Sequence, residues 1–234
     1  MNTNRKTAII VGVLYIIGTA AGILGGVVTG PVLNDPEYLA LVSANQNQMI
    51  VGVLLIFVMG FALVMVPVLL FPIFRKYNEA LAMGAVVFRG ALEGVAYILL
   101  VIAWLLLVTV SQEFVKAGMP DASNYQTWGT LLVAGFDWIE QILAIVFSLG
   151  ALMIYAVFYQ SRLIPRWLSI WGIAGGAVYL AVPVLFLFGV DVEFLMIPLG
   201  VQEMILALWL IVKGFSPAAV ADVPVRLRAG ASEA

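Results

Sequence analysis

The sequence predicts an all-α fold: a polytopic integral membrane bundle of six transmembrane helices with both termini in the cytoplasm. First, 64% of the residues are hydrophobic and only 10% are charged, whereas soluble domains are about 45–50% apolar and about 25% charged. Second, the chain contains six apolar runs long enough to cross a bilayer, which takes about 20 residues. Third, the basic residues gather between alternate runs, and this fixes an orientation.

The six runs are Thr7–Val28, Met49–Phe74, Leu81–Val110, Gly129–Tyr159, Trp167–Gly189 and Phe194–Gly214. Each is expected to be helical, because lipid cannot satisfy the backbone groups of an open strand. The first run is too long for a signal peptide and is expected to be a retained span. A short helix over Glu37–Ala44 is expected to lie along the membrane interface. We therefore predict a transmembrane domain over residues 1–215 and a flexible cytoplasmic tail over residues 216–234.

The orientation follows from the eleven basic residues. Cytoplasmic loops retain Lys and Arg. If the six runs cross the membrane in turn, nine of the eleven basic residues fall on one side of it and Lys116 falls on the other. Arg89 lies inside the third run. The nine are Arg5, Lys6, Arg75, Lys76, Arg162, Arg166, Lys213, Arg226 and Arg228.

Composition also excludes several functions. The chain has no Cys and no His, so it lacks thiolate metal sites, haem attachment, the commonest zinc ligand and the commonest general base. No metal or cofactor is expected. The net charge of −2 argues against nucleic acid as a partner, and the lipid bilayer is the expected partner.

Five ionisable side chains lie inside the runs, and two Gln side chains accompany them. Each charge at the bilayer centre costs about 2.5–3.5 kcal/mol, so these side chains are expected to face the interior and to meet one another. Their depths along the third, fourth and sixth runs agree with one shared cavity. The seven candidate ligand-binding or proton-binding residues are Arg89, Glu93, Asp137, Glu140, Gln141, Gln202 and Glu203.

The charge of this group is unbalanced. Four carboxylates and one guanidinium leave three negative charges if all are ionised, so the group is expected to hold protons, a metal ion or a cationic ligand. Glu140 is the first choice for a protonated carboxyl group, because it lies near the midplane one turn from Asp137. The alternative is structural: an Arg89–Glu93 pair joins helices, and the other acids are protonated and hydrogen-bonded.

Aromatic and small residues have two interpretations each. Six aromatic side chains could line the cavity, although packing or a lipid-facing belt explains each more readily: Tyr15, Tyr97, Trp104, Trp138, Tyr179 and Trp209. Two groups of small residues allow close helix approach: Gly18, Ala21, Gly22, Gly25 and Gly26, and then Gly172, Gly175, Gly176 and Ala177. Packing within the bundle is the first interpretation, and a homodimer seam through these glycine-rich faces is the second.

Several segments resemble one known family. They are RKTAIIVGVLYIIGTAAGILGG at the start, FRGALE over Phe88–Glu93, GALMIYAVFYQSRLIPRWLSIWGIAGGAVYL over Gly150–Leu180 and LALWLIVKGF over Leu206–Phe215. Together they resemble the bacterial multi-pass membrane proteins of domain-of-unknown-function family 4386, and SRLIPRWLS (Ser161–Ser169) is the most specific piece. The resemblance implies six helices in a bacterial inner membrane and supplies no activity. Some members place a His in the fourth helix; this chain has none, so a role built on that His would not transfer.

Three functions stay open at this point. A midplane acidic site with one Arg suits a proton-coupled or cation-coupled carrier of a small amphiphile or cation, or a receptor for a small amphiphile. The same carboxyl groups could act as general acids on a lipid or isoprenoid in an intramembrane enzyme. The third hypothesis is a structural or assembly protein without a ligand.

Overall fold

A computed structural model describes residues 3–117 and 122–221, and these residues form an all-α structure. Six helical segments are long and apolar enough to cross a membrane, in agreement with the six apolar runs of the sequence. The elements in chain order are α1 Thr3–Leu33, α2 Tyr38–Ala44, α3 Gln46–Phe74, α4 Glu79–Ala85, the π-helix η1 Val86–Leu92, α5 Glu93–Ala117, α6 Ala122–Ser161, α7 Arg166–Leu187, the 3₁₀ helix η2 Glu193–Met196, α8 Ile197–Val212 and α9 Pro217–Ala221.

The third span is assembled from α4, η1 and α5 without a break. Asn78 is its N-cap, and the Asn78 side chain accepts a hydrogen bond from the backbone N–H of Leu81 at 3.1 Å. Glu79 lies in the first turn, where a negative charge is favoured by the helix dipole. The span then widens into a π-helix over Val86–Leu92. A π turn inside an α-helix is rare and is frequently found at functional sites.

The chain divides into two compact units. Of the described residues, unit 1 contains 3–16, 62–93 and 144–221, and unit 2 contains 17–61, 94–117 and 122–143. Unit 1 therefore holds the start of α1, the second half of α3, α4, the Val86–Leu92 π-helix, the second half of α6 and the helices from α7 to α9. Its core includes Phe74, Tyr155 and Phe158, all exposed by 1% or less. The rings of Phe74 and Phe158 pack edge to face with centroids 4.9 Å apart.

Unit 2 is built from the second part of α1, the short helix α2, the first half of α3, most of α5 and the first half of α6. Its core includes Met49, Leu107 and Val42, which are completely buried. The rings of Trp104 and Phe136 pack at an interplanar angle of 33° with centroids 5.5 Å apart. The expected short helix near residues 37–44 is present as α2.

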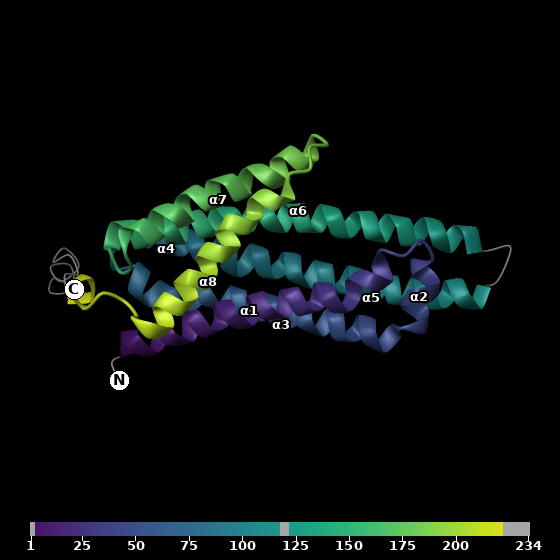
Figure 1. Ribbon diagram of the computed structural model, residues 1–234, viewed down its shortest axis with the longest axis horizontal. Helices are drawn as coiled ribbons and strands as arrows, with labels where there is room; N and C mark the ends of the chain where they lie inside the picture. The colour runs from purple at the N-terminus through teal and green to yellow at the C-terminus, as the bar shows by residue number, and fades with distance from the viewer. Residues whose placement is uncertain (1–2, 118–121, 222–234) are drawn as a thin grey trace, which may run out of the picture. The chain divides into compact units, whose positions relative to one another are not determined.

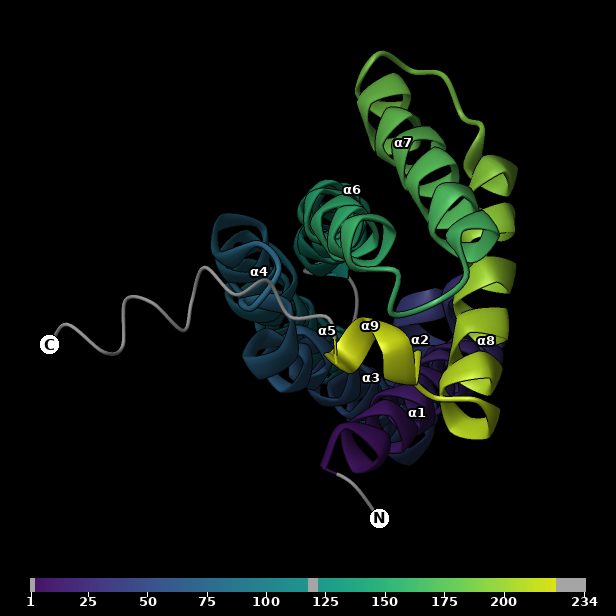
Figure 2. The same ribbon diagram turned by 90° about the vertical axis from the view of Figure 1, so that its left-hand side faces the viewer.

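Within unit 1, α7 and α8 form a hairpin of neighbouring helices joined by η2 (Figures 1 and 2). The end of α8 is bound to the start of α1 by Arg5. Its guanidinium donates hydrogen bonds to the carbonyl oxygens of Leu210, Ile211 and Val212 at 3.1, 2.6 and 3.0 Å. A cation at this position satisfies helix-terminal carbonyls that have no partner inside the helix.

Small residues place helices close together within each unit, as the packing interpretation expected. A Cβ on Gly172 would overlap the ring of Tyr155, and a Cβ on Gly22 would overlap the Met59 sulfur. Gly26 has no atom within 4 Å of the position a Cβ would take. The homodimer seam stays a prediction.

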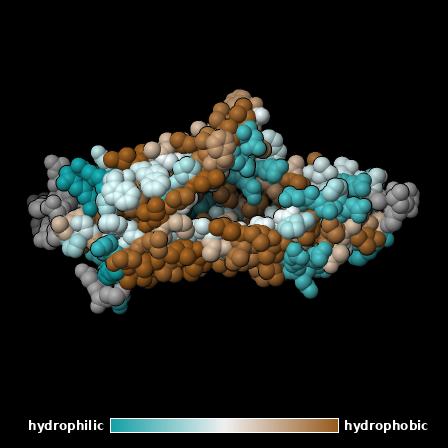
Figure 3. Space-filling model, viewed as in Figure 1, coloured by the Kyte–Doolittle hydropathy of each residue, from teal (hydrophilic) through white to brown (hydrophobic). Residues whose placement is uncertain are grey.

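Large apolar side chains are exposed along the long helices. Val27, Phe61 and Val212, for example, expose 66%, 64% and 66% of their surface. Figure 3 shows hydrophobic surface along these helices. Water-exposed apolar area on this scale would be unfavourable in a soluble monomer and is expected of helices that contact lipid.

The flexible cytoplasmic tail expected over residues 216–234 stays a prediction, and the described start of this segment contacts other parts of unit 1. Ser216 donates its backbone N–H to the Leu163 carbonyl at 2.9 Å, and the Tyr77 hydroxyl donates to the Ala219 carbonyl at 2.8 Å. The short helix α9 follows, with bounds Pro217–Ala221. The backbone of residues 216–219 therefore meets the α6–α7 turn at Leu163 and the α3–α4 connection at Tyr77, which a pattern of Pro and Ala cannot reveal. Residues 222–234 of the predicted tail lie outside the described residues.

Candidate functional site

Arg89 is the centre of the candidate site, and its side chain is completely buried in unit 1. It lies within the π-helix, one turn before Glu93. The second half of α6 approaches it at Gly150, where an added Cβ would come within 2.6 Å of the Arg89 Cβ and 2.7 Å of its backbone nitrogen. Because no side chain would fit at that position, the glycine lets α6 pack directly on the backbone of the π-helix.

Two carboxylates share the Arg89 guanidinium. Nη2 donates a hydrogen bond to Oε1 of Glu203 on α8 at 3.1 Å. Nη1 lies 3.8 Å from Oε2 of Glu93, an ion pair that is too long for a hydrogen bond. The side chains of Arg89 and Glu93 are completely buried, and that of Glu203 is 10% exposed. These three residues are called the Arg89 cluster below.

Aromatic rings cover the guanidinium. Its Cζ lies 4.2 Å from the centroid of Phe147 on α6 and 5.6 Å from that of Tyr15 on α1. Phe147 in turn packs against Tyr179 of α7 at 4.9 Å. A guanidinium over an aromatic face gains about 0.5–2 kcal/mol, more when water is excluded. The rings therefore stabilise the buried cation.

The Arg89 cluster contains buried polar atoms that lack hydrogen bonds to the described residues. They are Nε and Nη1 of Arg89 and both carboxylate oxygens of Glu93. Buried polar atoms in folded proteins almost always have a partner, so such atoms indicate a bound proton, water or ion. The charge count leads to the same conclusion: two ionised carboxylates and one guanidinium leave one negative charge in a buried site.

Beside the cluster, Gln202 has partners for both ends of its amide. Its Oε1 accepts a hydrogen bond from the Tyr155 hydroxyl at 2.7 Å, and its Nε2 donates to the Leu168 carbonyl at 3.0 Å. Gln202 therefore joins α6, α7 and α8 next to Glu203. Its role in this structure is to fix the helix that carries the Glu203 carboxylate.

The profile of one family, described as Domain of unknown function (DUF4386), matches residues 10–214 of the chain. The chain belongs to the DUF4386 family. This confirms the resemblance drawn from the sequence. No curated protein and no solved structure matches the chain.

For this DUF4386 protein, the structure brings together Arg89, Glu93 and Glu203 of the seven residues expected to form one cavity, with Gln202 adjacent. The expected interior position is not found for Asp137 and Glu140, which are exposed residues of unit 2. Helical phase places 137, 140 and 141 near one face, but it does not say where a neighbouring helix covers that face. Gln141 is buried in unit 2. A ligand-binding role for these three residues stays a prediction.

The six aromatic candidates are also distributed over the molecule. Tyr15 contacts the Arg89 guanidinium directly, and Tyr179 contacts it through Phe147. Trp209 lines a different cavity in unit 1. The remaining three candidates belong to unit 2: Tyr97 and Trp104 are buried, and Trp138 is 52% exposed.

Sequence reasoning missed Phe147, Gly150 and Tyr155. The first two look like any apolar or small residue in a long apolar run, so nothing in the sequence marked them. Tyr155 carried a usable signal, because a hydroxyl in the middle of a span must find a hydrogen-bond partner. The π-helix around Arg89 had no sequence signal. Among residues 3–117 and 122–221, no group of three His, Cys, Asp or Glu side chains is placed to hold a metal ion.

Proposed function

We propose that this DUF4386 protein is a membrane carrier or receptor whose Arg89 cluster takes up a proton, coupled to binding of a small amphiphilic or cationic ligand. The observation that carries the proposal is the state of Glu93: its carboxylate is completely buried, and neither oxygen has a hydrogen-bond partner among the described residues. A buried ionised carboxylate in this state would be strongly unfavourable. One added proton or cation neutralises the cluster.

The surroundings of the cluster support a switching role for it. Arg89 stands between two carboxylates and is close enough to donate a hydrogen bond to only one of them. Glu203 is slightly exposed, whereas Glu93 is completely buried. Protonation of Glu203 would weaken its ion pair with Arg89, and the guanidinium could then pair more closely with Glu93. Ionisable residues inside membrane proteins commonly form proton relays of this kind. Arg89 lies in a π-helix, where i→i+5 hydrogen bonds interrupt the regular α-helical pattern.

Infrared difference spectroscopy between acidic and alkaline buffers tests proton uptake. The wild-type protein should show a protonated carboxyl band that Glu93→Gln or Glu203→Gln diminishes. Glu79→Gln is the matched control, because Glu79 is an exposed residue at the start of the same span. A band that persists unchanged in both cluster variants would exclude Glu93 and Glu203 as the site of proton uptake and would favour a structural ion pair.

A transport assay tests the coupling. Proteoliposomes with a trapped pH indicator would receive the amphiphilic cation tetraphenylphosphonium under an imposed pH difference. The wild-type protein should move protons when the cation is added, and Glu93→Gln should not. Equal proton movement in the wild type, Glu93→Gln and protein-free vesicles would exclude a coupled carrier of such cations. A covalently changed lipid after incubation with membrane lipids would favour an intramembrane enzyme.

For the orientation, we propose that both termini lie in the cytoplasm and that the membrane is a bacterial inner membrane. The support is the excess of Lys and Arg between alternate spans, which are retained on the cytoplasmic side. Reporter fusions after Phe74, Tyr159 and Gly214 should all give a cytoplasmic signal. A periplasmic signal at any of the three would overturn this orientation.

A further inference from the structure

Helices α7 and α8 are the least covered of the six described spans. In their apolar stretches 28% and 33% of the residues are buried, against 39–50% in the other four. The uncovered part is the end at which the two helices are joined, residues 184–198, where no residue is buried. We call these residues the hairpin tip (Figure 1). Segments with few buried apolar contacts have low local stability, and the moving elements of proteins are drawn from them.

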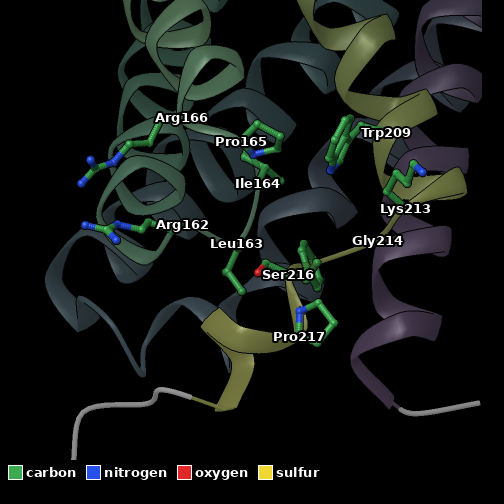
Figure 4. A pocket seen from close by; sticks show the side chains of 11 residues that line it. Arg162, Leu163, Ile164, Pro165, Arg166, Trp209, Lys213, Gly214, Ser216 and Pro217 are labelled. Atoms are coloured by element: carbon green, nitrogen blue, oxygen red, sulfur yellow. The ribbon is translucent and has the colours of Figure 1, made fainter.

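The other end of the hairpin is fixed to the rest of unit 1. Gly172 of α7 packs so closely on Tyr155 of α6 that an added Cβ would overlap the ring. Arg5 binds the last carbonyls of α8, and Leu163 in the α6–α7 turn accepts a hydrogen bond from the Ser216 N–H at 2.9 Å. Figure 4 shows this end, where the turn faces the end of α8 across a cavity of about 630 Å³. Bending is therefore expected between the fixed end and the tip.

Both helices have a residue that permits bending at this boundary. Pro183 lies inside α7 next to the hairpin tip, and a proline inside a helix removes a backbone hydrogen bond and favours a kink. On α8, Gly200 has no atom within 4 Å of the position a Cβ would take. At 1.5 Å per residue, Pro183 and Gly189 are about 9 Å apart along the helix. A change of about 20° in the kink would therefore move the tip by about 3 Å.

The Arg89 cluster lies directly below this boundary. Glu203, one turn after Gly200 on α8, accepts the hydrogen bond from Nη2 of Arg89 at 3.1 Å. The neighbouring Gln202 is tied to Tyr155 by a hydrogen bond between uncharged groups. Of these two ties on α8, only the one between Arg89 and Glu203 depends on the ionisation of a carboxylate.

The charged and titratable groups that face Glu203 come from three further elements. They are Arg89 and Glu93 on the third span, Tyr15 on α1 and Tyr155 on α6. Guanidinium groups and tyrosine hydroxyls keep their protons near neutral pH, so the two carboxyl groups are the ones whose charge can change. Glu203 is the one in hydrogen-bond contact with Arg89. Loss of its charge would leave the guanidinium to Glu93 and remove the ion pair that holds α8.

We propose that the α7–α8 hairpin is a proton-controlled gate: the Arg89–Glu203 ion pair holds α8 in the described position, and protonation of Glu203 lets the hairpin tip bend away. This inference rests on the proton uptake proposed above and adds the element that moves in response to it. Arg89 and Glu93 are completely buried and Glu203 is only 10% exposed. The gate supplies the access for a ligand that the described position lacks.

Distances between paired spin labels in the full-length protein test the gate. The chain contains no Cys, so labels attach only to introduced cysteines. Val190→Cys in the tip is paired with Met83→Cys on α4, and Ile170→Cys near the start of α7 is paired with the same Met83→Cys; all three residues are exposed. Between alkaline and acidic buffer, the tip distance should shift by about 3 Å. The distance from Ile170→Cys should not change.

Two substitutions separate the cluster from other acids. Glu203→Gln removes the charge and keeps the shape of the protonated carboxyl group, so the tip distance should have its acidic value in both buffers. Glu193→Gln is the matched control, because Glu193 is an exposed acid of the tip itself, and it should respond to pH like the unchanged protein. The comparison of buffers needs no change in the cluster, so it tests the gate even if Glu203→Gln does not fold.

A tip distance that is equal in both buffers would overturn the gate, and so would an equal shift of the distance from Ile170→Cys. Loss of the shift in Glu193→Gln would assign it to the charges of the tip and overturn the role of Glu203. Infrared difference spectra of the same samples distinguish this failure from failure of the proposed function. A carboxyl band that Glu203→Gln diminishes, without a change in distance, would keep the proton site and overturn the gate. A band that is unchanged in both cluster variants would overturn proton uptake itself.

Discussion

Replacing Arg89 by Leu is the most direct test of how the cluster is held together. The substitution keeps an apolar side chain against Phe147 and Tyr15 but removes the only cation within reach of Glu93 and Glu203 in the described structure. Both carboxyl groups would then remain in a buried site without a positive charge.

The magnitude follows from the geometry. Breaking a buried ion pair by removing one partner costs about 3–5 kcal/mol. Arg89 and Glu93 are completely buried and the contact with Glu203 is 3.1 Å, so the full range applies. The lost contacts with two aromatic rings add to this cost. For a chain of this length, 1 kcal/mol corresponds to about 2–4 °C, so the melting temperature should fall by about 6–20 °C.

The assay heats purified protein in detergent and measures the fraction that remains monodisperse at each temperature. Lys116→Leu is the matched control, because Lys116 forms an exposed ion pair with Glu113 at 2.8 Å and exposed pairs contribute little. Combining Arg89→Leu with Glu203→Leu should recover part of the loss, since the second change removes one of the orphaned carboxylates.

An Arg89→Leu protein with an unchanged melting temperature would refute the reasoning. So would a double variant that is less stable than the sum of its single changes. Either result would show that the guanidinium does not compensate buried charge in the folded protein.

Two further substitutions test the packing around the cluster. Gly150→Ala should lower stability by about 1–3 kcal/mol, because the new Cβ meets the backbone of the π-helix, whereas Gly26→Ala should not, because its Cβ has open space; equal melting temperatures for the two would contradict the close approach. Tyr155→Phe should cost about 1–3 kcal/mol by leaving the Gln202 oxygen without its donor. Tyr159→Phe, at an exposed ring, is the control, and an equally small effect in both would show that the buried hydrogen bond is not formed.

Much of the fold could be predicted because membrane spans follow from local composition. Each apolar run had to become a helix, since its backbone has no other partner in lipid. The short helix α2 was also expected, although its N-terminal bound is Tyr38 and not Glu37. The π-helix around Arg89 was not predictable, because a π turn depends on contacts with other helices. Gly150 on α6 is one such contact.

The candidate site could be predicted only in part for a related reason. The cost of burying charge correctly indicated that Arg89, Glu93 and Glu203 would meet. The same argument placed Asp137 and Glu140 inside, whereas both residues are exposed in the described structure. Which segments of α6 are covered is decided by packing between distant parts of the chain. Sequence periodicity carries no information about that packing.

The bond between Arg5 and the end of α8 has a consequence for the order in which the chain can be assembled. Its partners are separated by 205 to 207 positions in the sequence. The first helix therefore enters the bilayer long before its last partner has been synthesised. Contacts of such long sequence separation form late, because the intervening chain must be ordered first. The hydrogen bonds that join the start of α1 to the end of α8 therefore cannot form until the final helix has been synthesised.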